Sequence, residues 1–262
     1  MPTDKVFRYD LHCHTSIASV CGRILPEDLA KWYADLGYSG FCLTDHFSGA
    51  DPFPGLSWES RVDAYWAAYM RTREAGERLG LSVFFGIEYS LVPDPEHFSE
   101  SLGNDFLIYN ITKEYLRDNR SMFGMKPAEL FKKIRGDGGF IVHAHPYAET
   151  WYIEFIRLIP RSVDAVETLN GNKSLLENDM AKAYAEAYGL LETAGSDCHN
   201  RPWPYMCGLE TDAPCHTLPD LVSAIRGRQT RPFAIKITGE AAISSDKNII
   251  IHPSYPATRH SV

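Results

Sequence analysis

The chain has 262 residues, of which 44% are hydrophobic, and a formal net charge of −8 at pH 7. A chain of this length and apolar content can bury a full core, which argues against disorder. The acidic balance argues against a general affinity for nucleic acid or anionic membranes, because both require a basic face. No apolar stretch approaches the roughly 20 residues of a membrane span.

The start of the chain and its cysteines bear on the cellular compartment. The first ten residues, MPTDKVFRYD, lack the apolar region of a signal peptide. The six cysteines are scattered without paired CxxC spacing, so free thiols are the default interpretation. We therefore expect a cytoplasmic protein whose partner is neither a membrane nor a nucleic acid.

Strand-like and helix-like segments alternate along the chain. Apolar runs predict strands, and the amphipathic stretches between them predict helices. The predicted strands are 5–13, 39–44, 81–88, 105–111, 139–143, 163–168 and 190–195, with a later edge strand at 233–238. The predicted helices are 26–38, 59–79, 127–136, 174–188 and 218–228. Residues 89–104 are polar and broken by prolines, which predicts an excursion over the strand ends.

This alternation predicts an α/β fold with a parallel sheet and helices outside it. Polar residues end nearly every main strand, whereas an open sheet would bind its ligand at one switch point. The pattern therefore favours a closed barrel with its site at the C-terminal ends of the strands. We predict a single domain over 1–262, with a core over about 5–238 and a peripheral C-terminal tail.

Two of the strand ends carry paired histidines. In DLHCHTS, His12 and His14 share a face of the strand because side chains alternate. Asp10 shares that face and is a candidate to orient one of the rings. In IVHAHPY, His143 and His145 are related in the same way. Two imidazoles on one face can chelate one metal ion.

Three further strand ends combine carboxylates with imidazoles. Asp45 and His46 follow the second strand, Glu88 ends the third, and GSDCH pairs Asp197 with His199. Each has an ordinary alternative, such as a helix N-cap for Asp45 or a rim salt bridge for Glu88. A carboxylate buried at a strand end needs a partner, however, and a metal ion would supply one. Together, the strand ends predict a site for divalent metal ions.

In order and spacing, the segments DLHCHTS, LTDH, GIE, AHP and GSDCH resemble the motifs of the PHP (polymerase and histidinol phosphatase) family over about residues 8–200. The resemblance implies a distorted (β/α)7 TIM-like barrel that binds two or three divalent ions (zinc, manganese or iron) and hydrolyses phosphate monoesters or diesters. The metal ligands that it implies are His12, His14, Glu88 and Asp197 for a first ion, Glu88 and His145 for a second, and His46 and His199 for a third.

Two segments depart from the family pattern. Where a further ligand of the third ion is expected, the chain has Ser19, Cys21 and Arg23. A Cys21 thiolate would prefer zinc, whereas Arg23 could instead bind a substrate phosphate. Near the fourth strand, where the family often has a histidine, the candidate ligands are Asp105 and Asn110.

The chemistry expected at such a site is hydrolysis of a phosphate ester by a metal-activated hydroxide. We predict Asp45, His199 and Arg23 as catalytic residues. Arg23, Arg201 and His143 are the predicted substrate-binding residues, since a guanidinium matches the geometry of a phosphate. His143 has less weight than His145 as a ligand, because the family often carries a non-ligand there.

The sequence thus predicts a metal-dependent phosphoesterase acting on a small phosphorylated substrate, with a phosphomonoesterase favoured over a phosphodiesterase. Trp58 and Trp203 are candidates for a stacking wall, although packing is the commoner role of such side chains. One alternative is an amidohydrolase-like enzyme that cleaves C–N or C–O bonds, but no candidate bridging lysine ends a strand. The other is a nuclease or polymerase-associated module, against which the acidic charge argues.

Overall fold

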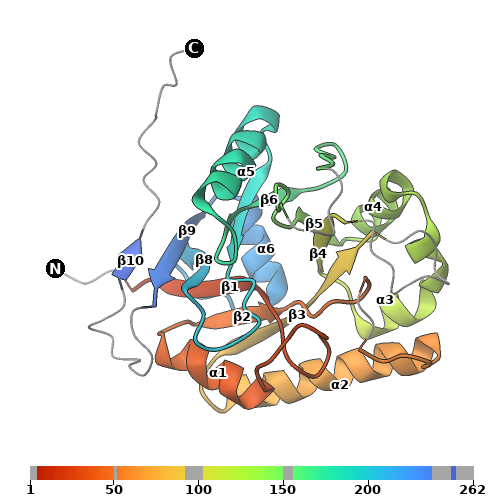
Figure 1. The fold of residues 1–262 in the computed structure, drawn as a ribbon, viewed down its shortest axis with the longest axis horizontal. Coiled ribbons are helices and arrows are strands. Elements are labelled where there is room, and N and C mark those ends of the chain that lie inside the picture. The colour runs from red at the N-terminus through yellow and green to blue at the C-terminus, as the bar shows by residue number, and fades with distance from the viewer. Residues whose placement is uncertain (1–4, 50–51, 92–102, 150–155, 238–248, 252–262) are drawn as a thin grey trace.

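The computed structural model describes residues 5–49, 52–91, 103–149, 156–237 and 249–251 (Figure 1). The strands are β1 Phe7–Cys13, β2 Gly40–Leu43, β3 Ser82–Ser90, β4 Asp105–Tyr109, β5 Phe140–His143, β6 Ala165–Asn170, β7 Leu191–Gly195, β8 Tyr205–Thr211, β9 Thr230–Lys236 and β10 Ile249–Ile251. The helices are α1 Pro26–Asp35, α2 Trp58–Glu77, α3 Lys113–Asp118, α4 Pro127–Gly136, α5 Leu175–Tyr188 and α6 Leu218–Arg226, with a 3₁₀ helix at Arg120–Gly124.

The described strands form one mixed sheet in the order β10-β9-β8-β1-β2-β3-β4-β5-β6-β7. The pairs β1–β2, β2–β3, β5–β6 and β6–β7 are parallel. Strand β4 is antiparallel to both β3 and β5, and β8 is antiparallel to both β1 and β9. The sheet is therefore mixed in direction rather than uniformly parallel.

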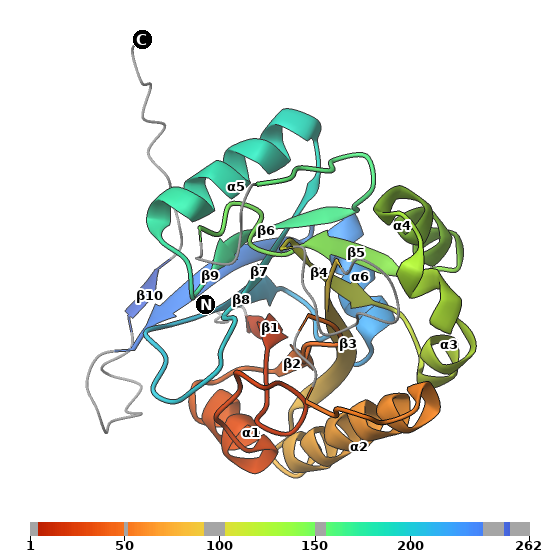
Figure 2. The same cartoon turned by 45° about the vertical axis from the view of Figure 1, so that its right-hand side comes forward.

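The two ends of the β1–β7 array meet and nearly close a barrel (Figure 2). The Asp197 N–H, just past β7, donates to His12 O of β1 at 2.8 Å, and the His14 N–H donates to Cys198 O at 3.1 Å. Gly195 makes this approach possible, because a Cβ atom there would lie 2.3 Å from His12 Cβ. Closure thus brings the residues that follow β7 against those that end β1.

Apolar side chains cover both faces of the sheet. One buried cluster includes Leu11, Leu107 and Val142 and is joined by Leu221 and Ile225 of α6. The other lies between the sheet and helices α1 to α4; its large members include Trp32, Tyr33, Phe41, Phe85, Phe106 and Phe131. Helix α5 packs through a smaller cluster of Ala181, Tyr184 and Ala185 with Val166 of β6. Burial on both faces explains why the strands are nearly continuous apolar runs.

The helices begin and end at residues suited to those positions. Pro26 and Pro127 open α1 and α4, where a missing N–H costs no hydrogen bond. Ser174 and Glu177 form a capping box at the start of α5, and Gly189 ends that helix in the left-handed conformation with φ of 65°. Among the described residues, no helix is both long enough and apolar enough to cross a membrane.

The α/β fold with a barrel-like sheet is confirmed, with corrections to the strands. The expectation of a parallel sheet is wrong for β4, whose direction depends on pairing with distant residues. Strand β8 lies outside the predicted strands. Its Gly208 interrupts the apolar run and lets the strand approach Tyr9, whose carbonyl oxygen would lie 2.4 Å from a Cβ there. The predicted edge strand 233–238 is β9, which lies between β8 and β10.

Two other expectations fall largely on residues outside the described part of the chain. Strand β3 continues to Ser90, but residues 92–102 of the predicted excursion over the strand ends are not described. Of the C-terminal tail beyond residue 237, only 249–251 is described, as strand β10 beside β9. The predicted peripheral position of the tail therefore stays a prediction.

We predict that Gly195→Ala destabilises the fold, because the added Cβ would also lie 2.7 Å from His12 N. Such overpacking costs about 1–3 kcal/mol. The matched control is Gly136→Ala in α4, where a Cβ meets no atom within 4 Å; alanine there should raise the free energy of unfolding by up to about 1 kcal/mol. Denaturant unfolding of both variants measures the difference. Equal stabilities would contradict the tight closure of β7 on β1.

Candidate metal centre

The predicted metal ligands meet at one end of the barrel, where the parallel strands end. His12 lies in β1 and Glu88 in β3, and the others follow the ends of β1, β2, β5 and β7. Five of them, His46, Glu88, His145, Asp197 and His199, line a pocket of about 360 Å³, and His12 and His14 lie beneath it against Glu88 and Asp197. The side chains that line the pocket are Cys21, His46, Glu88, Asp105, His145, Asn172, Lys173, Asp197, His199 and Trp203.

Two imidazoles and two carboxylates converge at the first position. His12 Nε2 lies 3.4 Å from Glu88 Oε1 and 3.5 Å from Asp197 Oδ1. His14 Nε2 lies 3.4 Å from Glu88 Oε2 and 3.3 Å from Asp197 Oδ1. Both Nε2 atoms are buried and have no hydrogen-bond partner among the described residues. Leaving a buried polar atom unsatisfied costs about 1–3 kcal/mol, and a divalent cation held by all four side chains would remove that cost. The residues therefore fit a metal ion.

His12 is oriented by Glu167, a carboxylate in β6. Glu167 Oε1 lies 3.0 Å from His12 Nδ1, which leaves His12 Nε2 directed at the first position. Glu167 Oε2 accepts hydrogen bonds from the His145 N–H at 3.0 Å and from Asn170 Nδ2 at 2.8 Å. Burial by itself lowers the pKa of His12, but Glu167, Asp197 and Glu88 together raise it well above its ordinary value. The surrounding charge thus favours a cation at this point.

Asp45 and Ser19 orient His14. Ser19 Oγ donates to Asp45 Oδ1 at 2.7 Å and lies 3.1 Å from His14 Nδ1. Asp45 also accepts from Thr15 N at 2.7 Å and Thr15 Oγ1 at 2.8 Å. Burial raises the pKa of Asp45 to about 6, although these hydrogen bonds oppose the shift. Asp45 therefore holds the loop after β1 and does not line the pocket, and Ser19 bridges a ring and a carboxylate.

A second position lies beside the first and shares Glu88. Ligand atoms of Glu88, Asp105 and His145 lie within 4.8 Å of one another. His145 Nε2 is 3.3 Å from Glu88 Oε1 and 4.0 Å from Asp105 Oδ2. Because β4 runs antiparallel to β3, its first residue, Asp105, reaches this end of the barrel. Asn110, beyond the far end of β4, lines a different pocket.

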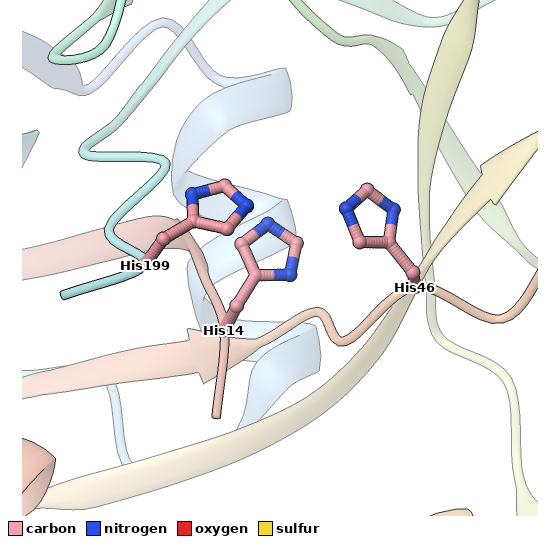
Figure 3. Close-up of side chains that lie close together, drawn as sticks. All are labelled: His14, His46 and His199. Atoms are coloured by element: carbon pink, nitrogen blue, oxygen red, sulfur yellow. The ribbon is translucent and has the colours of Figure 1, made fainter. Parts of the chain in front are cut away.

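A third position is formed by His14, His46 and His199, whose ring nitrogens also lie within 4.8 Å of one another (Figure 3). The His14 ring stacks between the other two, with centroids 4.6 Å from His46 and 4.3 Å from His199. Cys21 lines the pocket here. Burial raises the pKa of the Cys21 thiol, but its interactions with His199 and His46 outweigh burial and lower the pKa to about 7. Of the three residues considered for this position, Cys21 is the one that lines the pocket beside the imidazoles.

The three predicted substrate-binding residues lie elsewhere. Arg23 donates through one guanidinium nitrogen to carbonyls of its own loop, 2.9 Å from Val20 O and 3.3 Å from Gly22 O. The Arg201 guanidinium lies 5.6 Å from the ring centroid of Trp32. His143 is fully buried and stacks on Phe106, so it faces the helix layer. None of the three predicted residues lines the pocket.

His143 and His145 do not share a face, because the chain leaves the extended conformation between them. His145 has φ of 25°, in the left-handed region that a non-glycine residue rarely adopts. Asp197 has φ of 50° at the equivalent place after β7. Such conformations persist where the surrounding structure fixes them, and they gather at functional sites. The alternation of side chains along a strand therefore fails at these two ligands.

Sequence reasoning missed four residues at or beside the site: Glu167, Asn170, Asn172 and Lys173. The rule that identified Glu88 also applies to Glu167, which stands in the buried strand AVETLN. Asn172 Nδ2 donates to Asp197 Oδ2 at 3.2 Å.

The expected orienting role of Asp10 is different in the structure: Asp10 accepts hydrogen bonds from Tyr33, Ser196 and the His12 backbone N–H. Of the two tryptophans considered, Trp203 lines the pocket and Trp58 packs in the core.

Comparison with known proteins identifies one family model, described as the PHP domain, that matches residues 10–195. The chain is 35% identical over 110 residues to an error-prone DNA polymerase from Cutibacterium acnes, a match of 41% of this chain and 8% of the polymerase. It is 31% identical over 87 residues to a PolC-type DNA polymerase III from Oceanobacillus iheyensis, covering 33% of this chain and 5% of the polymerase. The chain therefore matches only a small part of the length of these curated relatives.

Among solved structures, the chain resembles a two-domain protein from Bacteroides vulgatus described as containing a predicted PHP-like metal-dependent phosphoesterase. The TM-score is 0.61 at 16% identity, over 87% of this chain and 64% of that chain. At this identity the likeness supports the fold of the chain.

We predict that Glu167→Gln weakens metal binding by about 10- to 100-fold, because removing a partner of a metal-binding histidine has this effect. Titration of metal-free protein with Zn²⁺ or Mn²⁺ measures the affinity. The matched control is Glu192→Gln in the adjacent strand β7, whose carboxylate accepts from Thr168 Oγ1 at 3.1 Å. An unchanged affinity in Glu167→Gln would show that His12 is not a ligand oriented by Glu167.

Proposed function

Because the chain belongs to the PHP-domain family, we propose that it is a metal-dependent phosphoesterase that acts on a small phosphorylated substrate. The observation that carries this proposal is the pair of buried, unpartnered Nε2 atoms of His12 and His14, which face the carboxylates of Glu88 and Asp197. Imidazole and carboxylate together suit zinc, manganese and iron. The same proposal includes the single domain over 1–262, the distorted (β/α)7 form of the barrel and a cytoplasmic location.

The proposal assigns two or three divalent ions to the three positions. His12, His14, Glu88 and Asp197 would hold the first ion, and Glu88, Asp105 and His145 the second. His46, His199 and Cys21 would hold the third, where a thiolate would favour zinc. Glu88 is the natural bridge between the first two positions, since its oxygens face His12, His14, His46 and His145 at 2.8–3.4 Å. Burial raises the pKa of Glu88, but His46 and His12 outweigh burial and hold it well below the ordinary value, so the carboxylate is ionised.

When bound, such ions would neutralise phosphoryl oxygens and lower the pKa of a water molecule, so that it loses a proton and the resulting hydroxide can attack phosphorus. The protein's own contribution is to fix the ligands and to handle the proton of the leaving group. Glu167 and Ser19 hold the His12 and His14 rings in place through their Nδ1 atoms. With two ions bound, His199, whose ring is partly exposed in the pocket, is the proposed donor of a proton to the leaving oxygen; with a third ion bound, that ion would neutralise the leaving oxygen instead. Asp45 supports this arrangement through the loop that it holds.

The pocket supports a small substrate. Its volume of about 360 Å³ is near the lower end of ligand pockets. Trp203 provides an apolar wall, and its indole N–H donates to Ser196 O at 2.9 Å, which fixes the ring. We propose a phosphomonoesterase first and a phosphodiesterase second.

A second candidate function, a nuclease or polymerase-associated module, is supported by the matches to two DNA polymerases. The formal net charge of −8 weighs against it, because a nucleic-acid groove requires basic residues. An amidohydrolase-like activity is less well supported, because the family model that matches the chain is the PHP domain.

One screen distinguishes these functions. Purified protein is analysed for bound metal and assayed for release of phosphate from monoesters and diesters, of nucleotides from single-stranded DNA, and of products from amides and lactones. We expect bound divalent metal and hydrolysis of phosphate monoesters that stops on chelation and returns with Mn²⁺ or Zn²⁺. Activity on amides alone, or no activity with metal fully bound, would refute the phosphoesterase proposal.

We predict that His12→Ala loses bound metal and activity together, because His12 contributes to the first position and packs against Gly195 at the barrel closure. Metal content and phosphate release are measured on the same preparation. His216→Ala is the control, since this exposed histidine lines the pocket at the far end of the barrel. Normal metal content in folded His12→Ala would refute the ligand assignment.

A further inference from the structure

The turn between β6 and α5 forms part of the pocket wall through Asn172 and Lys173. Gly171 fixes this turn against the end of β7 and the start of β8. Its N–H donates to Gly195 O at 3.0 Å, and a Cβ atom at Gly171 would lie 2.2 Å from Tyr205 O. The turn therefore lies against the segment that carries Trp203, and both contribute to one wall.

Lys173 is the only lysine or arginine among the described residues that line the pocket. The side chain is half-buried and, within the described part of the chain, has no ion pair within 4 Å. The nearby Glu177 carboxylate is engaged by the backbone N–H groups of Ser174 at 2.7 Å and Glu149 at 3.0 Å. Lys173 is attracted electrostatically to Glu177 but makes no ion pair with it within 4 Å, so its charge is left to attract an anion in the pocket that it lines.

The carboxylates that line the pocket face groups other than Lys173. Glu88 and Asp105 face the imidazoles of the metal positions. Asp197 Oδ1 faces His12 and His14, and its Oδ2 accepts from Asn172. Asn172 thereby joins the turn to the metal centre, and the backbone of the adjacent Lys173 is held beside it by a hydrogen bond from its N–H to Asn170 O at 3.3 Å.

The two arginines expected to bind phosphate are engaged outside the pocket, Arg23 by its own loop and Arg201 by the Trp32 ring. A substrate phosphate needs cations around its oxygens in addition to the metal ions. Lys173 can supply such a charge, because an ammonium group, unlike a planar guanidinium, can bind a phosphate oxygen from many directions.

We propose that Lys173 is the substrate-binding cation of this site and binds the phosphoryl group of a dianionic phosphate monoester, while Asn172 positions it. This inference rests on the proposed phosphoesterase function and deepens it. A cation added beside the metal ions favours a dianion over a monoanion, because the attraction scales with the charge of the ligand. The apolar part of the ester would lie along Trp203.

The test is equilibrium binding of inorganic phosphate to the metal-bound protein by calorimetry, with metal content measured for every variant. We expect Lys173→Gln to weaken phosphate binding by about tenfold, equivalent to about 1.4 kcal/mol, without loss of metal. Lys173→Arg keeps the charge and should stay within about threefold of the original affinity. Arg23→Gln and Arg201→Gln are the matched controls and should leave the affinity unchanged.

The proposal is overturned if phosphate does not bind, if Lys173→Gln binds phosphate as the original protein does, or if Lys173→Gln loses metal. It is also overturned if Arg23→Gln or Arg201→Gln weakens binding while Lys173→Gln does not. The binding measurement requires no turnover, so it tests the role of Lys173 independently of the proposed phosphoesterase activity. Phosphate binding that depends on Lys173, in a protein that hydrolyses no phosphate ester, would refute the proposed function and the substrate role of Lys173, and would leave only its role in binding phosphate.

Discussion

The closure of β7 on β1 is the constraint on which the rest of the site depends. The N–H of Asp197 bonds to the carbonyl of His12, and Gly195 leaves room for the His12 side chain. This contact joins the last strand of the barrel to the first and sets Asp197 opposite the two histidines that end β1. A metal position made from residues 185 apart in the chain (12 to 197) therefore follows from backbone hydrogen bonding.

The charges at the site favour a bound cation. Glu88, Asp197 and Glu167 are buried around His12, and burial alone would raise the pKa of a carboxyl. The imidazoles outweigh burial and lower the pKa of Glu88 and Asp197 well below their ordinary values. Ionised carboxylates in a buried site require compensating positive charge, which a divalent ion held by His12, His14, Glu88 and Asp197 would supply.

Sequence reasoning succeeded where one local rule decides the outcome. Parallel strands end at one edge of a sheet, so polar residues after their apolar runs must gather; this places His12, Glu88 and Asp197 together. Sequence reasoning failed where pairing between strands that are distant in the chain determines which residues reach the site. The direction of β4 selects Asp105 over Asn110, and no local pattern shows that direction.

Side-chain direction in loops was also beyond sequence reasoning. Arg201 lies two residues past His199, yet its guanidinium turns to Trp32. Lys173 carries no motif, and it reaches the pocket through the contacts of Gly171 with Gly195 and Tyr205 and of Asn172 with Asp197. Loop residues are placed by contacts with distant parts of the chain, whereas residues at strand ends are placed by the strand itself.

Diffraction from crystals grown with zinc or manganese, recorded at the absorption edge of the metal, tests the central claim most directly. The account predicts an anomalous peak within coordination distance of His12 Nε2, His14 Nε2 and the carboxylates of Glu88 and Asp197. A second peak is predicted between Glu88, Asp105 and His145. Anomalous peaks confined to surface residues, with none beside His12 and His14, would contradict the account.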